Sequence, residues 1–100
     1  MDRRLVILVE FTLAPATRDA FRALVLENAA ASMQRELGCR QFDVLIPEGD
    51  PGDRVILYEI YDNAAAFEAH LASEHYRRFA EASGPLVLTK TVTRLGFARA

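Results

Sequence analysis

Four polar side chains stand in stretches of the sequence that are otherwise apolar, and their chemistry is that of proton transfer. Glu59 interrupts the apolar run 54–61, while Asn28, His70 and His75 fall within segments of helical periodicity. A carboxyl group buried among apolar residues has a raised pKa, which suits a general acid or base. A neutral imidazole can also accept a proton, and an amide can hold a substrate oxygen. These four residues are therefore the first candidates for a reaction site.

Asn28 and Glu59 each have a structural interpretation that competes with the functional one. Asn28 falls on the apolar stripe of a long helix, where it is either a core amide bonded to backbone or the polar lining of a pocket. Glu59 is either a structural residue, at an edge position or in an ion pair with Arg40 or Arg94, or a desolvated residue beneath a covering layer. The sequence leaves both choices open.

The two histidines lie five residues apart, which is not the spacing of a metal-binding pair. Ligands on one helical face are three or four residues apart, and a spacing of five rotates the second side chain by about 140°. No third ligand is evident, so no metal is expected, and His70 is predicted to pair with Glu74. His75 is predicted in the first turn of a helix that restarts at Ser73. The helix dipole there lowers the pKa of a histidine, which makes His75 the better candidate for a base.

Apolar periodicity and helix-breaking residues define the strands and helices that position these side chains. Strands are predicted over 5–13, 39–46, 54–61 and 86–97, a helix begins at Pro15 or Thr17 and ends at Leu37, and a second helix runs from about 63 to 83 with an interruption at Ser73. The predicted N-caps are Thr17, Asp62 and Ser73, and Gly38 is the predicted stop of the first helix. The order β-α-β-β-α-β predicts one α+β domain over residues 1–100, with a ferredoxin-like four-stranded antiparallel sheet and helices on one face.

Two of the predicted strands are apolar on both faces, although the helices suffice to cover only one. In the first strand Val6 and Leu8 point to the face opposite Ile7 and Val9, and in the third Ile56, Tyr58 and Ile60 oppose the other apolar residues. An apolar sheet face exposed to water would be a large adhesive patch. The sequence therefore predicts a homodimer in which two sheets pack face to face.

Composition and motifs argue against several classes of protein. The net charge of −2 and the lack of a basic run argue against nucleic-acid binding, and no segment reaches the roughly 18 apolar residues of a membrane span. Cys39 is the one cysteine, so it cannot form an internal disulfide, and we interpret it as a packing residue of a cytoplasmic protein. No phosphate-binding loop, dinucleotide fingerprint or nucleophile elbow is present, so no nucleotide or flavin cofactor is expected.

Two longer stretches resemble the antibiotic biosynthesis monooxygenase domain family: "ENAAASMQRELGCRQFDVL" from Glu27 and "LYEIYDNAAAFEAHLASEHYRRF" from Leu57. The resemblance extends from Leu5 to about Arg94. Its most specific parts are Asn28, the Gly38-Cys39-x-x-Phe42 sequence, Glu59 before an aromatic residue, Phe67 with His70, and His75 with Phe79.

The resemblance implies a dimeric α+β barrel with a pocket in each subunit between helices and sheet. Some members oxidise polycyclic phenols or hydroquinones with molecular oxygen and no cofactor, and others isomerise a phosphorylated autoinducer-2 derivative. The quinol-monooxygenase-like and autoinducer-2 phosphate isomerase-like branches fit the motifs best. A related branch degrades haem with an Asn, a Trp and a His, but this chain has no Trp and no Asn in its first strand.

The main hypothesis is a cofactor-independent monooxygenase that acts on a hydroquinone or related enolisable aromatic. Such a site needs a base, a polar group for the substrate oxygen and aromatic walls. His75 or Glu59 is the predicted base, Asn28 binds the substrate oxygen, and the substrate-binding residues are Phe42, Tyr58, His70 and Phe79. The alternatives are an isomerase, for which Arg40, Arg77 and Arg78 are the nearby basic residues, and a non-catalytic dimeric module that binds a small molecule.

Overall fold

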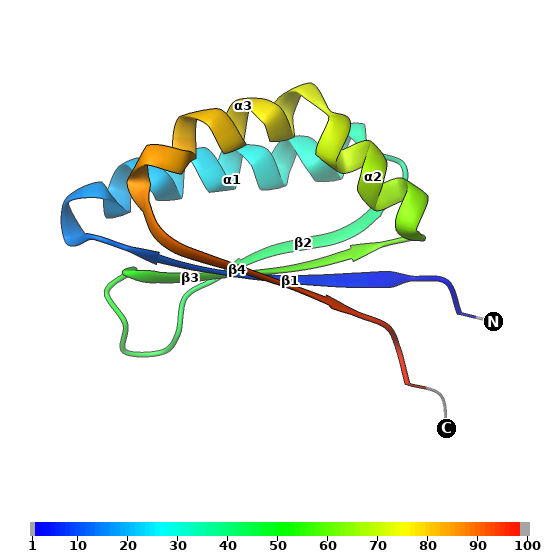
Figure 1. Cartoon of the computed structure of the whole chain (residues 1–100), viewed down its shortest axis with the longest axis horizontal. Helices are drawn as coiled ribbons and strands as arrows, with labels where there is room; N and C mark the ends of the chain where they lie inside the picture. The colour runs from blue at the N-terminus through cyan, green and yellow to red at the C-terminus, as the bar shows by residue number, and fades with distance from the viewer. Residues whose placement is uncertain (1, 99–100) are drawn as a thin grey trace.

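Two layers make up the chain: a four-stranded antiparallel sheet, and helices that pack on one of its faces (Figure 1). The structure is a computed structural model and describes residues 2–98. Its elements are β1 (Leu5–Leu13), the 3₁₀ turn η1 (Pro15–Thr17), α1 (Arg18–Arg35), β2 (Cys39–Leu45), β3 (Arg54–Tyr61), α2 (Ala64–Ala72), α3 (Glu74–Ser83), the 3₁₀ turn η2 (Gly84–Leu86) and β4 (Val87–Leu95). The predicted α+β fold is confirmed, including the second helix in two pieces.

The register of the strands decides which side chains face the helices. The strand order is β2-β3-β1-β4, so β1 and β3 are central. Ile7 lies opposite Glu59 and Val9 lies opposite Leu57. All four side chains are buried on the face that the helices cover. Glu59 is therefore not an edge residue, and it lies beneath a covering layer.

Aromatic side chains join the sheet to the helices at the end of the molecule where α1 begins. The ring of Phe11 on β1 lies 4.8 Å from that of Phe21 on α1, and 6.4 Å from that of Phe79 on α3. Phe21 and Phe79 are 5.9 Å apart, in the edge-to-face geometry that aromatic pairs prefer. This three-ring cluster fixes the helices over the central strands.

The serine that was predicted to restart the second helix does so. Ser73 is the N-cap of α3, and its hydroxyl oxygen accepts a hydrogen bond from the backbone N–H of Tyr76 at 3.2 Å. The preceding helix begins one residue later than predicted, because Asn63 caps it by accepting from the N–H of Ala66 at 2.8 Å. The prediction that Asp62 is the cap was wrong, since its carboxylate instead pairs with a neighbouring arginine.

Two predictions about the ends of the first helix also need correction. Thr17 makes no side-chain cap for α1, because its hydroxyl donates to the carbonyl oxygen of Leu86 at 2.9 Å and ties η1 to η2. The helix ends at Arg35, before the predicted Leu37. Gly38 is not in the left-handed conformation of a helix stop, since Gly49 and Gly52 are the glycines of positive φ among residues 2–98.

The sheet face that points away from the helices carries the apolar residues of β1 and β3 that the sequence grouped on one face. Val6 pairs with Ile60 and Leu8 with Tyr58, so these side chains share that face along the central strands. The flanking strands add polar groups, which are Gln41 and Asp43 on β2 and threonines on β4, and also the exposed apolar residues Leu45 and Leu95. We call the apolar residues Val6, Leu8, Ile56, Tyr58 and Ile60 the open-face strip.

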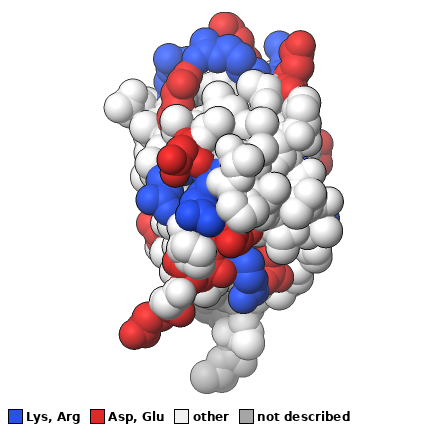
Figure 2. All heavy atoms as spheres, turned by 90° about the vertical axis from the view of Figure 1, so that its left-hand side faces the viewer, with Lys and Arg blue, Asp and Glu red and all other residues white. Residues whose placement is uncertain are grey.

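Figure 2 shows one end of the molecule, where acidic and basic side chains are interspersed rather than gathered into one patch of a single sign. Within residues 2–98, no helix is both long enough and apolar enough to span a membrane.

Gly38 is required by the close approach of the segment before β2 to helix α2. A Cβ atom at this position would lie 2.5 Å from the Cβ of Ala66, a distance that real atoms do not tolerate. We therefore expect Gly38→Ala to lower the free energy of unfolding by about 1–3 kcal/mol, because an overpacked contact forces backbone to shift. Urea denaturation of the purified variant measures the change.

Gly84→Ala is the matched control, because nothing lies within 4 Å of the Cβ position there. That variant should unfold within about 0.5 kcal/mol of the parent chain, as surface substitutions usually do. Equal stabilities of the two variants would contradict the steric explanation.

Candidate active site

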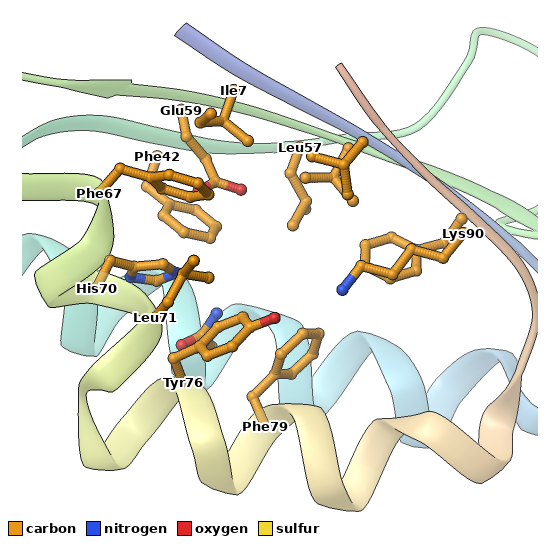
Figure 3. A pocket seen from close by; sticks show the side chains of 14 residues that line it. Ile7, Phe42, Leu57, Glu59, Phe67, His70, Leu71, Tyr76, Phe79 and Lys90 are labelled. Atoms are coloured by element: carbon orange, nitrogen blue, oxygen red, sulfur yellow. The ribbon is translucent and has the colours of Figure 1, made fainter. Parts of the chain in front are cut away.

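A cavity lies between the covered face of the sheet and the helices (Figure 3). Side chains from all four strands and from α1, α2 and α3 line it. Its walls are mostly apolar and aromatic, and five polar side chains reach it: Asn28, Glu59, His70, Tyr76 and Lys90. The cavity volume is about 50 Å³, which is room for a few water molecules. A mostly apolar cavity with a few convergent polar groups is the usual form of a small-molecule site.

Glu59 is the acidic group of this cavity. Its side chain is directed from β3 toward the shared space, and the residue is 3% exposed. Burial raises the pKa of Glu59 to about 7, although a hydrogen bond of 2.6 Å from the Tyr61 hydroxyl to Oε1 opposes the rise. The alternative ion pairs are not formed: Arg40 pairs with Asp62, and the Arg94 guanidinium lies 5.3 Å from the Phe67 ring centroid.

Asn28 lines the cavity from α1, and its amide is not satisfied by the protein. The residue is 3% exposed, and Oδ1 is buried with no hydrogen-bond partner among residues 2–98. Of the two interpretations of the sequence, this geometry favours the polar lining of a pocket over a core amide bonded to backbone. An unpaired buried acceptor can bind a hydroxyl group of a ligand, and otherwise costs about 1–3 kcal/mol.

Lys90 and Tyr76 are cavity residues that sequence reasoning missed. The ammonium group of Lys90 points into the cavity from β4, 5.8 Å from the Phe11 ring centroid and 5.9 Å from that of Tyr76. Lys90 lies opposite Phe11 in the β1–β4 register, which turns it toward the helix-covered side. The signal was a lysine inside a predicted strand, but its direction depends on a pairing that the sequence does not reveal.

The two histidines meet on one carboxylate, that of Glu36. The Nδ1 of His70 lies 2.8 Å from Glu36 Oε2, and the Nε2 of His75 lies 2.5 Å from the same oxygen. The predicted pairing of His70 with Glu74 was wrong, because Glu36 at the end of α1 lies within hydrogen-bond distance of both imidazoles. Burial is the main cause that lowers the pKa of His70, and the Glu36 carboxylate opposes that change.

The two reasons for expecting no metal were the five-residue spacing of the histidines and the lack of a third ligand, and neither holds in the structure. The 140° rotation assumed a continuous helix, but α2 ends at Ala72 and α3 begins at Glu74 in a new direction. The third group, Glu36, is distant in the sequence and comes from a different helix. No periodicity within one segment could have identified it.

The predicted site residues therefore divide between two places. Asn28, Glu59, Phe42, His70 and Phe79 line the cavity, as a single site requires. His75 instead lies in a neighbouring surface hollow between α1 and α3, which Asn28 and Phe79 also line.

Tyr58 needs correction as a substrate-binding candidate. It is adjacent to Glu59 in β3, so its side chain points to the opposite face and joins the open-face strip. Cys39 is buried near the cavity, and burial raises the pKa of its thiol to about 12. A thiol of that pKa is unreactive, in agreement with its interpretation as a packing residue.

Comparison with known proteins adds the family. Residues 4–82 match the family described as Antibiotic biosynthesis monooxygenase. This chain belongs to that family. A Mycobacterium tuberculosis (strain H37Rv) relative, Rv0793, is named as a candidate monooxygenase and is 32% identical over 92 residues, which are 92% of this chain and 87% of the relative.

Solved structures agree with the family membership and with the fold. The structure of Rv0793 superposes with a TM-score of 0.86 at 28% identity, over 97% of both chains. The structure of PA3566 from Pseudomonas aeruginosa superposes with a TM-score of 0.89 at 25% identity, over 99% of this chain and 98% of that one. The chain therefore has a general monooxygenase-like function by family, with the cavity as its candidate active site.

The raised pKa of Glu59 predicts a stability that falls as pH rises. The folded chain holds a proton on Glu59 up to a pH near 7, whereas the unfolded chain releases it near 4.5. The folded state binds more protons in this window, so its stability decreases with pH through the window. Between about pH 5 and pH 8, the free energy of unfolding of the parent chain should fall by roughly 2–3 kcal/mol relative to that of Glu59→Gln.

Urea denaturation at several pH values measures this difference. Glu68→Gln is the matched control, because Glu68 is exposed on α2 and should leave the pH dependence of the parent unchanged. Parallel stability curves for the parent and Glu59→Gln would show that Glu59 titrates normally.

Proposed function

We propose that the chain is a cofactor-independent monooxygenase that oxidises a small hydroquinone, or a related enolisable aromatic, with molecular oxygen. The observation that carries the proposal is Glu59: a buried carboxyl with a pKa of about 7 that faces an aromatic-lined cavity. A base of that pKa operates efficiently near neutral pH. Membership of the family and the name of the mycobacterial relative support the monooxygenase class.

Deprotonation of the substrate is the step that the protein has to provide. Glu59 takes the phenolic proton, and the Lys90 ammonium, which reaches the same cavity, attracts the phenolate that forms. Asn28 Oδ1 accepts a hydrogen bond from the second hydroxyl. The electron-rich phenolate then reduces oxygen, so one hydroquinone and one O₂ give one hydroxyquinone and one water.

The size of the cavity favours a substrate with one ring. A cavity of about 150 Å³ accommodates benzene, whereas this one has a volume of about 50 Å³. A ring can enter if side chains at the exposed side move outward, and Lys90 and Val92 on edge strand β4 are exposed enough to do so. A polycyclic phenol would require the packed aromatic walls to separate as well.

Oxygen uptake with a panel of hydroquinones, in chelator-treated buffer, tests the reaction. Glu59→Gln keeps the shape and the partner of the side chain but removes the base, so kcat/KM should fall roughly 100- to 10,000-fold. Asn28→Ala should raise KM, because the substrate loses a hydrogen bond. Quinone formation is followed by absorbance.

Glu68→Gln again serves as the control and should retain the activity of the parent. Undiminished quinone formation in both Glu59→Gln and Asn28→Ala would remove the case for this cavity. Turnover of a small sugar phosphate under nitrogen would indicate the isomerase alternative. That alternative has less support, since Arg40 and Arg78 are held in ion pairs with Asp62 and Glu27.

We also propose that the protein is a homodimer joined through the open-face strip. The strip places Leu8, Tyr58 and Ile60, which are only partly buried, on a sheet face that the chain's own helices leave uncovered. Apolar residues in a continuous row on a sheet favour burial against a second, identical row. The family resemblance implies the same arrangement.

Ile60→Asp tests the dimer by introducing a charge into the strip. The parent should elute at twice the mass of the 11.2-kDa chain in light-scattering chromatography, and the variant at the mass of one chain or as unfolded protein. Leu37→Asp is the control, because Leu37 is 93% exposed beyond the end of α1 and should not change the mass. A parent that elutes as a monomer at all concentrations would contradict the proposal.

A further inference from the structure

The end of α1 meets the junction of α2 and α3 behind one wall of the cavity. Glu36 is the C-cap of α1, His70 lies in the last turn of α2, and His75 lies in the first turn of α3. Two imidazoles and one carboxylate are the donor set that proteins use for zinc and for other divalent first-row metals. We propose that Glu36, His70 and His75 bind one divalent transition-metal ion, such as zinc.

The positions of the three donor atoms suit a single ion. The Nδ1 of His70, the Nε2 of His75 and an oxygen of Glu36 all lie within 4.8 Å of one another. Ligand atoms in a zinc site lie about 2.0–2.2 Å from the ion. Since the nitrogens now stand 2.8 and 2.5 Å from Glu36 Oε2, the three side chains would move apart to seat the ion between them.

The electrostatic surroundings of Glu36 also favour a cation. Only 12% of its side chain is exposed, and the side chains of the two histidines are 9% exposed or less. Oε1 of Glu36 is buried and has no hydrogen-bond partner in the described part of the chain. A buried carboxylate needs a positive partner. An ion at this point supplies that charge and gives Oε1 a ligand as well.

Proton balance limits how the ion binds. In the hydrogen-bonded arrangement, His70 donates from Nδ1 and His75 donates from Nε2 to the same carboxylate oxygen. Coordination requires a lone pair on each of these nitrogens, so each histidine carries its proton on its other ring nitrogen in the metal-bound form. Both imidazoles remain neutral, and the carboxylate provides the one negative charge.

The ion would hold the site in place without taking part in the chemistry. Of its three ligands, His70 lines the cavity, whereas Glu36 and His75 do not. The ion therefore sits behind the wall that His70 forms, and fastens the end of α1 to the junction of α2 and α3. This inference does not depend on which reaction the cavity performs.

Untagged protein, stripped with a chelator, is titrated with zinc by calorimetry and with cobalt(II) by visible absorption. We expect one equivalent of either ion per chain, d–d bands from nitrogen and oxygen ligands on cobalt, and a higher Tm at saturating zinc because the ion binds the folded chain. Glu36→Gln and His75→Gln should each weaken binding at least about 100-fold, since each removes a direct ligand.

Glu68→Gln is the control and should bind as tightly as the parent. Circular dichroism of each metal-free variant shows whether it is folded, and His75→Gln, at the more exposed of the two histidines, keeps the test decisive if Glu36→Gln fails to fold. Less than stoichiometric binding to the parent would overturn the proposal, and would show that the three residues form a hydrogen-bonded cluster only. Equal binding by the parent and His75→Gln would overturn it too.

Discussion

The pairing register of β1 and β3 is the constraint on which the rest of the site depends. Successive side chains of a strand point to opposite faces, so a slip of one residue would move Glu59 out from beneath the helices and put Tyr58 in its place. The register is fixed because Ile7, Val9 and Leu57 bury their side chains on the same face as Glu59. Hydrophobic burial thus holds a carboxyl group where its desolvation raises its pKa.

Two acidic residues, Glu59 on β3 and Glu36 at the end of α1, are then partly or fully buried in different surroundings. Glu59 accepts a hydrogen bond from the Tyr61 hydroxyl and faces a cavity, so its proton is available to a molecule that enters. Glu36 faces two imidazoles behind the wall and does not line the cavity. The proximity of Glu36 adds to the rise in the pKa of Glu59, after the larger effect of burial. Glu59 can therefore exchange a proton with a ligand in the cavity, whereas Glu36 orients the histidine that forms part of the cavity wall.

The interruption between α2 and α3 allows His70 to line the cavity while both His70 and His75 contact Glu36. Ser73 caps α3 with its side chain while its backbone N–H still bonds to the carbonyl oxygen of His70. The change of direction lets His70 stay in the cavity wall while His75 reaches the other side of Glu36. In an unbroken helix the two imidazoles would point about 140° apart and could not share a carboxylate. A local capping interaction thus determines a tertiary cluster.

Local patterns in the sequence determined the elements, their order, the break at Ser73 and the apolar character of both faces of the central strands. These features follow from spacing within one segment, which is why the fold and the polar candidates Asn28, Glu59 and His70 could be identified from the sequence. Phe42 and Phe79 were expected to line the site because of the family resemblance. Only the tertiary structure decided which face each strand presents, and so turned Tyr58 away from the cavity and Lys90 into it. It alone brought Glu36 to both histidines, because contacts between residues 34 and 39 positions apart leave no periodic signal in the chain.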